Sequence, residues 1–205
     1  MFDLDGTLVD SEEFIVWTFV EAGRIVGARV DPRRVSEMIG YPLDTVLEKV
    51  LDASNVDLER FKSVRKRIIE ENWRKMIRVF PEVHDTLEYL ESKGYVLGVA
   101  SSSITPRIRM FLEYFGLTSF FKVISGVEEG VKGKPEPDVI LKALSELKLP
   151  ASQAVYVGDR FVDCVASSRA GVDFILVDRN GSYDGGWSCT PFYVVKTLGD
   201  LTKLL

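Results

Sequence analysis

The first residues of the chain place two carboxylates, Asp3 and Asp5, two positions apart and directly before a Gly6-Thr7 turn. Aspartate is uncommon in strands, so this pair is a poor choice for packing. Side chains at i and i+2 of an extended backbone point the same way, so both carboxylates would face one site. At about 4 Å they would repel by about 4 kcal/mol at an effective dielectric near 20, unless a cation or proton lies between them. The pair predicts a divalent-cation site, and its hard oxygens suit Mg²⁺.

Three polar segments downstream weigh against the alternative, an acidic turn at a fraying terminus. Ser101 and Ser102 directly follow the apolar run 96–100, so they should lie where a buried strand ends, at the edge where open α/β sheets bind ligands. Lys134 is followed by prolines at 135 and 137, which stiffen the loop and hold the lysine in place. A fixed ammonium suits a phosphoryl group.

The last of these segments adds two more carboxylates. Asp159 comes just after the apolar run 155–157, and Asp163 lies one helical turn later on the same helix face. Asp159 alone could be an ordinary helix cap. Two further acids aimed at the same sheet edge as Asp3 and Asp5 instead predict a phosphate and metal site.

The segments between these motifs predict two kinds of structure. Residues 11–79 show only helical periodicity, with helices expected over 11–26, 43–51 and 57–77. After residue 80, strands expected over 95–100, 121–124, 154–157 and 174–177 alternate with helices, which is typical of a doubly wound parallel sheet. The fold class is therefore α/β: a Rossmann-like core formed by residues 1–10 and 80–205, with an inserted helical cap domain formed by residues 11–79.

Composition limits the class of protein. The formal net charge of −5 argues against a protein that binds nucleic acid or a membrane surface, so we expect neither as a partner. No run approaches the ~18 apolar residues of a membrane span. Cys164 and Cys189 give no disulfide framework, and we expect a reducing, cytoplasmic location. We also expect a monomer or weak dimer.

Together the segments DLDGT at Asp3, the strand-end serine Ser101, KGKPEPD around Lys134 and GDRFVD at Asp159 resemble the four motifs of the haloacid dehalogenase-like hydrolase superfamily. The resemblance spans the whole chain, and its helical insertion is similar to the caps of phosphoglycolate phosphatases and β-phosphoglucomutases. It implies a Mg²⁺-dependent phosphatase acting on a small phosphorylated metabolite, phosphoglycolate or a sugar phosphate, through an aspartyl-phosphate intermediate.

The resemblance also assigns roles. Asp3 would be the nucleophile and Asp5 the general acid and base. Asp3, Asp159 and the backbone carbonyl of Asp5 would bind the metal, while Asp163 would hold the metal's waters or the neighbouring ligands. The phosphoryl oxygens would be bound by a set of three residues: Ser101, Ser102 and Lys134.

Two alternatives stay open. A β-phosphoglucomutase-like phosphomutase would have a histidine and an arginine where this chain has Ile15 and Leu43, which favours hydrolysis. A non-catalytic binding relative would show decay at the catalytic positions, and these are intact. Relatives usually have several apolar residues before the first aspartate. Here only Met1 and Phe2 precede it, so either the first strand is short or the natural start lies upstream.

Overall fold

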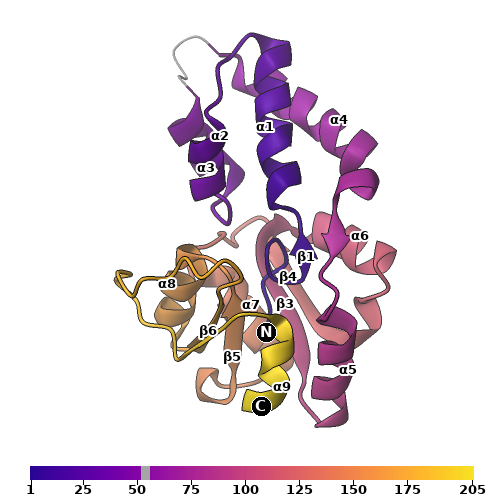
Figure 1. Ribbon diagram of the computed structural model, residues 1–205, viewed down its shortest axis with the longest axis vertical. Helices are drawn as coiled ribbons and strands as arrows, with labels where there is room; N and C mark the ends of the chain where they lie inside the picture. Colours follow the sequence, from indigo (N-terminus) through magenta and orange to yellow (C-terminus); the bar gives the residue numbers. More distant parts are fainter. Residues whose placement is uncertain (52–55) are drawn as a thin grey trace. The chain divides into compact units, whose positions relative to one another are not determined.

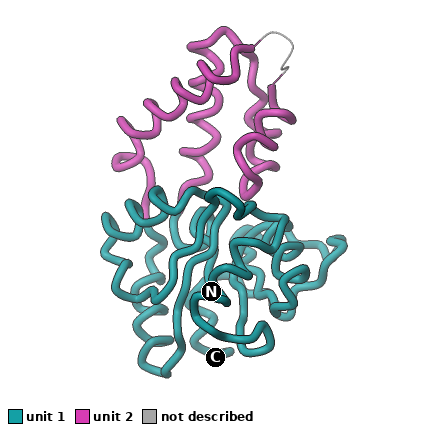
Figure 2. Tube along the Cα trace, turned by 180° about the vertical axis from the view of Figure 1, so that it is seen from behind, with its two compact units in different colours: residues 1–9, 79–205 teal, residues 10–78 magenta. Residues whose placement is uncertain are grey.

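A computed structural model describes residues 1–51 and 56–205 (Figure 1). The chain forms two compact units (Figure 2). Each unit has its own hydrophobic core. Unit 1 comprises Met1–Val9 with Val79–Leu205, and unit 2 comprises Asp10–Arg78. The paired two-residue strands β1 (Val9–Asp10) and β2 (Arg78–Val79) contain the two unit boundaries.

In its described residues, unit 2 is helical apart from these boundary strands, as its sequence periodicity predicts. Its helices are α1 (Glu12–Val26), α2 (Pro32–Glu37), α3 (Leu43–Val50) and α4 (Leu58–Met76). Phe19 and Phe61 pack in its core with ring centroids 6.0 Å apart. Asp31 caps α2 by accepting a hydrogen bond from the Arg33 amide at 3.0 Å. Among the residues described, no helix has both the length and the apolar character that a membrane crossing requires.

Unit 1 alternates strands and helices along the chain. Its strands are β3 (Leu97–Ile104), β4 (Phe121–Val127), β5 (Val155–Gly158), β6 (Asp173–Val177) and β7 (Tyr193–Val195). Its helices are α5 (Val83–Ser92), α6 (Thr105–Tyr114), α7 (Asp138–Leu147), α8 (Phe161–Ala170) and α9 (Leu201–Leu204). Short 3₁₀ turns lie at Thr118–Phe120, Ala151–Gln153 and Leu198–Asp200.

The strands of unit 1 form a parallel sheet. β3 pairs with β4, and β5 pairs with β6, which pairs with β7, all in parallel. Phe2 bridges β3 at Val99 and β5 at Val157, so the spatial order is β4, β3, the N-terminal segment, β5, β6, β7. Helices α6 and α7 pack on β3 and β4, and α8 packs on β5 and β6. The predicted α/β fold with a parallel sheet and a helical N-terminal region is confirmed.

β3 and β7 differ from the expectation, β4 runs three residues past its expected end, and the short strands β1 and β2 were not expected. β3 begins at Leu97, because Tyr95 and Val96 are 43% and 51% exposed, and it continues through the serines to Ile104. The serines therefore lie within the last part of a strand. β7 was not expected, because the apolar run 192–195 that contains it is short, and only Val195 of its three residues is buried.

The two cysteines correct a further expectation. Cys164 on α8 and Cys189 form a disulfide, with their Cα atoms 6.1 Å apart. The segment before β7 also packs on the start of α8 through Trp187, whose ring lies 5.7 Å from that of Phe161. The pairing joins positions 25 residues apart, and only the return of this segment over α8 brings the two thiols together.

Candidate active site

The N-terminal segment is held as a short central strand between β3 and β5. The Phe2 amide donates to the Gly98 carbonyl, and the Phe2 carbonyl accepts from the Ala100 amide, both at 2.9 Å. On its other side, the Asp3 amide donates to the Val157 carbonyl at 2.9 Å. These bonds place Asp3 at the carboxyl edge of the sheet, where open parallel sheets bind ligands.

Lys134 is fully buried, which for a lysine requires paired charges. Its Nζ lies 2.6 Å from Asp3 Oδ1 and 2.5 Å from Asp163 Oδ1, and it donates to the Tyr156 hydroxyl at 3.2 Å. That hydroxyl in turn donates to the Ala100 carbonyl at 2.6 Å. Burial alone would lower the pKa of Lys134, but the Asp163 and Asp3 carboxylates outweigh it and hold the pKa well above its usual value. The ammonium therefore stays charged at neutral pH.

The Asp3 carboxyl group is almost as buried as the lysine, with 3% of its side chain exposed. Burial raises the pKa of Asp3 to about 8; the Lys134 ammonium opposes this shift, and the charges of Asp163 and Asp159 add to it. Asp3 Oδ1 is buried, and Lys134 Nζ forms an ion pair with it at 2.6 Å. A further cation at this carboxylate would stabilise its ionised form.

Asp159 and Asp163 lie at the turn from β5 into α8. Asp159 accepts hydrogen bonds from Thr7 Oγ1 at 2.9 Å and from Arg160 Nε at 3.0 Å. Burial, together with the nearby Asp163 charge, raises the pKa of Asp159 to about 6. Asp163 Oδ2 accepts from the backbone amides of Asp159 at 3.1 Å and Arg160 at 2.8 Å. Asp163 thus fixes the backbone that carries Asp159, and Arg160 pairs with that neighbouring acid.

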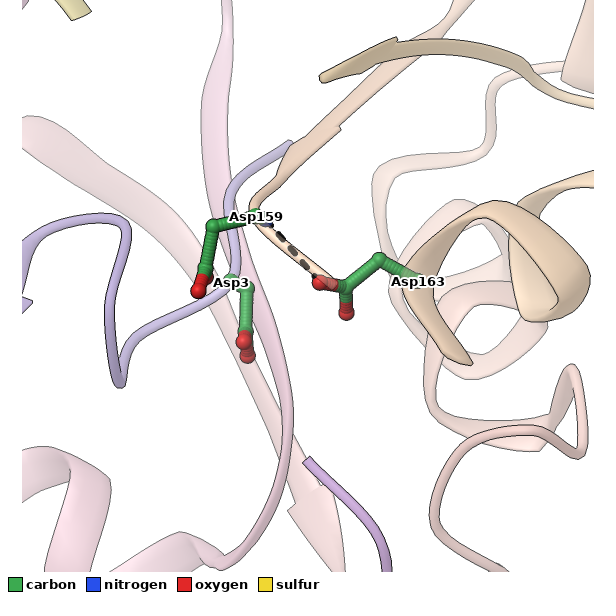
Figure 3. A group of neighbouring side chains, drawn as sticks. All are labelled: Asp3, Asp159 and Asp163. Atoms are coloured by element: carbon green, nitrogen blue, oxygen red, sulfur yellow. Dashed lines mark hydrogen bonds between the residues drawn. The ribbon is translucent and has the colours of Figure 1, made fainter. Parts of the chain in front are cut away.

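The three carboxylates gather at one point (Figure 3). Asp3, Asp159 and Asp163 each offer an oxygen, and these oxygens all lie within 4.8 Å of one another. Both oxygens of Asp163 are already engaged, by Lys134 and by backbone amides, so Asp163 fits a supporting position. Asp3 and Asp159 are the better candidates for direct contact with an ion. Hard oxygen donors of this kind could hold Mg²⁺.

The turn after Asp5 is shaped to fit beside Asp159. Gly6 has φ of +85°, a backbone conformation that side chains rarely adopt. A Cβ at this position would lie 2.3 Å from Asp159 Oδ2, closer than any side chain tolerates. Glycine is therefore required both by the backbone conformation and by the space, and it lets Thr7 reach Asp159.

Asp5 is contacted by two residues that the sequence did not single out. Ser103 Oγ donates to Asp5 Oδ2 at 3.2 Å, and Arg107 on α6 lies with Nη2 3.4 Å from Asp5 Oδ1. Ser103 could have been suspected, because it ends the same serine run as Ser101 and Ser102. No sequence signal marked Arg107, because its contact depends on how α6 begins after β3.

The predicted phosphate-binding serines lie beside the lysine loop. Ser101 is buried, and its Oγ accepts from the Ser103 amide at 3.3 Å. Ser102 Oγ accepts from the Lys134 amide at 3.0 Å, which ties the lysine loop to β3. The structure thus places Lys134 in contact with Asp3 and with Ser102. The roles of these residues in binding and catalysis stay predictions.

The sequence matches one protein family over most of its length and is similar to several named proteins. The family model of haloacid dehalogenase-like hydrolases matches residues 1–177, which include all the site residues described above. The phosphoglycolate phosphatase of Aquifex aeolicus is 32% identical over 206 aligned residues, covering 100% of this chain and 95% of that protein. The putative pyrophosphatase PpaX of Caldanaerobacter subterraneus is 29% identical over 198 residues, covering 96% of this chain and 84% of that protein.

Solved structures agree with this match. A putative haloacid dehalogenase-like hydrolase from Bacteroides fragilis superposes with a TM-score of 0.88 at 27% identity, covering 98% of this chain and 97% of that one. A predicted phosphoglycolate phosphatase from Haemophilus somnus shares the fold, with a TM-score of 0.84 at 24% identity and coverage of 99% and 95%. With the family model spanning most of its length, the chain belongs to the haloacid dehalogenase-like hydrolases.

Proposed function

We propose that this protein is a Mg²⁺-dependent phosphatase that hydrolyses a small phosphorylated metabolite through a phosphorylated Asp3. The observation that carries the proposal is the buried Lys134, whose ammonium lies 2.6 Å from Asp3 within a group of three carboxylates. A lysine and an acidic cluster at the carboxyl edge of a parallel sheet combine binding groups for a phosphoryl anion with a carboxylate nucleophile.

In the first step, an ionised Asp3 oxygen attacks the phosphorus, and the bond from phosphorus to the ester oxygen breaks. The leaving oxygen takes a proton from Asp5, so the products are the alcohol and phosphorylated Asp3. Asp5 is suited to this exchange because its side chain is 11% exposed and bonded to a serine hydroxyl and an arginine. Lys134 neutralises Asp3 and offers its ammonium to the phosphoryl oxygens, with Ser101 and the Ser102 amide alongside.

In the second step, water attacks the phosphorus of phosphorylated Asp3 and gives its proton to Asp5. Inorganic phosphate leaves, and Asp3 and Asp5 return to their starting states. Phosphate monoesters are among the slowest esters to hydrolyse without a catalyst. This is why one site would combine a covalent nucleophile, an acid and base, and several positive charges.

Asp3, Asp159 and the backbone carbonyl of Asp5 would hold the Mg²⁺ ion. The ion supplies positive charge that offsets the negative charge of the transferring phosphoryl group. The donor set fits this ion, because Asp3 and Asp159 are carboxylates whose pKa values are raised first by burial and then by the neighbouring carboxylate charges. Asp163 would fix Asp159 and Lys134 rather than bind the ion.

The relatives and the helical unit 2 support a proposal for the substrate class. The aligned relatives include a phosphoglycolate phosphatase and a putative pyrophosphatase. Phosphoglycolate is our leading candidate, followed by a sugar phosphate. Residues 11–79 would act as a cap domain that selects the substrate and excludes bulk water during phosphoryl transfer.

A screen of phosphorylated metabolites tests the proposal. Purified protein is assayed for phosphate release with Mg²⁺ and with EDTA, next to Asp3→Asn as the matched control. We expect Mg²⁺-dependent release from at least one ester and none from the variant. If no phosphate ester or anhydride is turned over by a protein that binds Mg²⁺, the proposed function is wrong.

A further inference from the structure

Arg107 contacts Asp5, the general acid and base of the proposed mechanism. It is the third residue of α6, and its Nη2 lies 3.4 Å from Asp5 Oδ1. Its side chain is 20% exposed, so it is partly accessible from the sheet edge. Its guanidinium also lies above the ring of Phe111, 5.1 Å from the centroid, which supports the side chain from below.

The guanidinium has hydrogen-bonding capacity beyond this contact. Arginine offers five N–H donors in a planar fork that matches a carboxylate or a phosphoryl group in a bidentate way. The distance to Asp5 is long for a charged hydrogen bond, and within the described residues Arg107 Nε is buried without a hydrogen-bond partner. A buried donor left unsatisfied costs free energy that a bound anion would recover.

The other cations near the acidic cluster are more tightly engaged. Lys134 is fully buried between Asp3 and Asp163. Arg160 donates to Asp159 at 3.0 Å, a shorter contact on a proposed metal ligand. Arg107 therefore has the longest ion-pair contact of these three cations, and it is the one best placed to exchange its carboxylate partner for a substrate anion.

The position of Arg107 also indicates which part of the substrate it would contact. Asp5 would protonate the oxygen that leaves phosphorus, so a residue at Asp5 lies on the leaving-group side of the substrate. We infer that Arg107 binds a second anionic group of the substrate, a carboxylate or a second phosphoryl group, carried by the leaving group a few bonds from the scissile oxygen. The inference rests on the proposed function and narrows its substrate class to compounds with two anionic groups.

Binding of the second anion would change the contacts of Asp5. When the substrate anion draws the guanidinium onto itself, Asp5 keeps its hydrogen bond from Ser103. Substrates without a second anion would leave Arg107 on Asp5.

The test compares substrates that differ in the second anion. We would measure kcat/KM at saturating Mg²⁺ for 2-phosphoglycolate, pyrophosphate and ethyl phosphate, which has no second anionic group. The proteins are the unmodified chain, Arg107→Gln, Arg107→Lys and Arg109→Gln. Arg109 lies two residues further along α6 and is exposed, so it is a matched control for loss of one positive charge.

We expect Arg107→Gln to lower at least one selectivity ratio, phosphoglycolate or pyrophosphate over ethyl phosphate, by at least about tenfold. The ratio that falls identifies the second anion as carboxylate or phosphoryl. Arg107→Lys should give an intermediate ratio, because lysine keeps the positive charge but cannot form the bidentate hydrogen bonds of a guanidinium. This variant provides the test if Arg107→Gln does not fold. Arg109→Gln should leave both ratios unchanged.

Two results would overturn the inference while leaving the proposed function intact. Unchanged ratios in both Arg107 variants would show that Arg107 takes no part in selection. An equal fall in kcat/KM for all three substrates would show that Arg107 only orients Asp5. If the unmodified protein turned over none of the three and no other phosphate ester, the proposed function would fail first, and this inference with it.

Discussion

Replacing the proposed nucleophile should stabilise the metal-free protein while it abolishes turnover. Asp3→Asn keeps the size and shape of the side chain but removes its ionisable group. Turnover should fall by at least about a thousandfold, because no other residue could take over covalent attack at that position. The same substitution should raise the free energy of unfolding, because it removes a carboxyl group that is buried in the folded protein.

The magnitude follows from the burial of Asp3. Its pKa is about 8 in the folded protein and 3.8 in the unfolded chain. A raised carboxyl pKa means that folding disfavours the ionised form, so stability is highest below pH 3.8 and is lost as the pH rises toward 8. At pH 7 this loss is about 4 kcal/mol. Asparagine cannot replace the ion pair with Lys134, which offsets part of the gain, so we expect a net gain on the order of 2 kcal/mol.

The assay is urea unfolding of both proteins in EDTA at pH 5 and pH 8. The gain from Asp3→Asn should be larger at pH 8, where unmodified Asp3 is increasingly forced to ionise in a buried site. Saturating Mg²⁺ should shrink the gain, because it stabilises the unmodified protein through Asp3. A variant that is less stable than the unmodified protein in EDTA at pH 8, or a gain that does not grow with pH, would refute the reasoning.

Three other substitutions have expected outcomes. Asp159→Asn should raise the Mg²⁺ concentration that half-maximally increases the melting temperature by about tenfold or more; an unchanged midpoint would remove Asp159 from the metal site. Gly6→Ala should lower the free energy of unfolding by about 1–3 kcal/mol, because of the strained φ and the clash with Asp159. A smaller loss, measured by urea unfolding, would contradict the packing seen here. Cys189→Ser should lower the unfolding free energy by about 3 kcal/mol without reductant, because it opens a loop of 25 residues. In reducing buffer the two proteins should be equally stable, and a difference that persisted there would assign the effect to packing.

The sheet could be predicted from the sequence because buried parallel strands are apolar throughout. The runs before Ser101 and Asp159 met this condition, so the residues that follow them were expected at one edge. β7 is apolar as well, but it has only three residues and two of them are exposed, so its run was too short to be recognised as a strand. The end of β3 was also missed, because serines are more typical of turns than of strands.

The parts of the site that could not be predicted depend on contacts between distant segments. Thr7 reaches Asp159 across 152 positions, and Arg107 reaches Asp5 across 102. Hydrophobic periodicity places elements but does not say which side chain fills the space between two of them. The disulfide between Cys164 and Cys189 was missed for the same reason, because the return of the segment before β7 over α8 has no periodic signal.

The central claim is that Asp3 becomes covalently phosphorylated. Its most direct test is rapid acid quenching during turnover of a phosphate ester with Mg²⁺, followed by mass spectrometry of the peptide that contains Asp3. We predict a peptide heavier by one phosphoryl group, with the modification on Asp3 and absent from Asp3→Asn. Rapid Mg²⁺-dependent hydrolysis with no phosphorylated peptide, and with Asp3→Asn retaining a tenth or more of the rate by the same assay, would contradict the account.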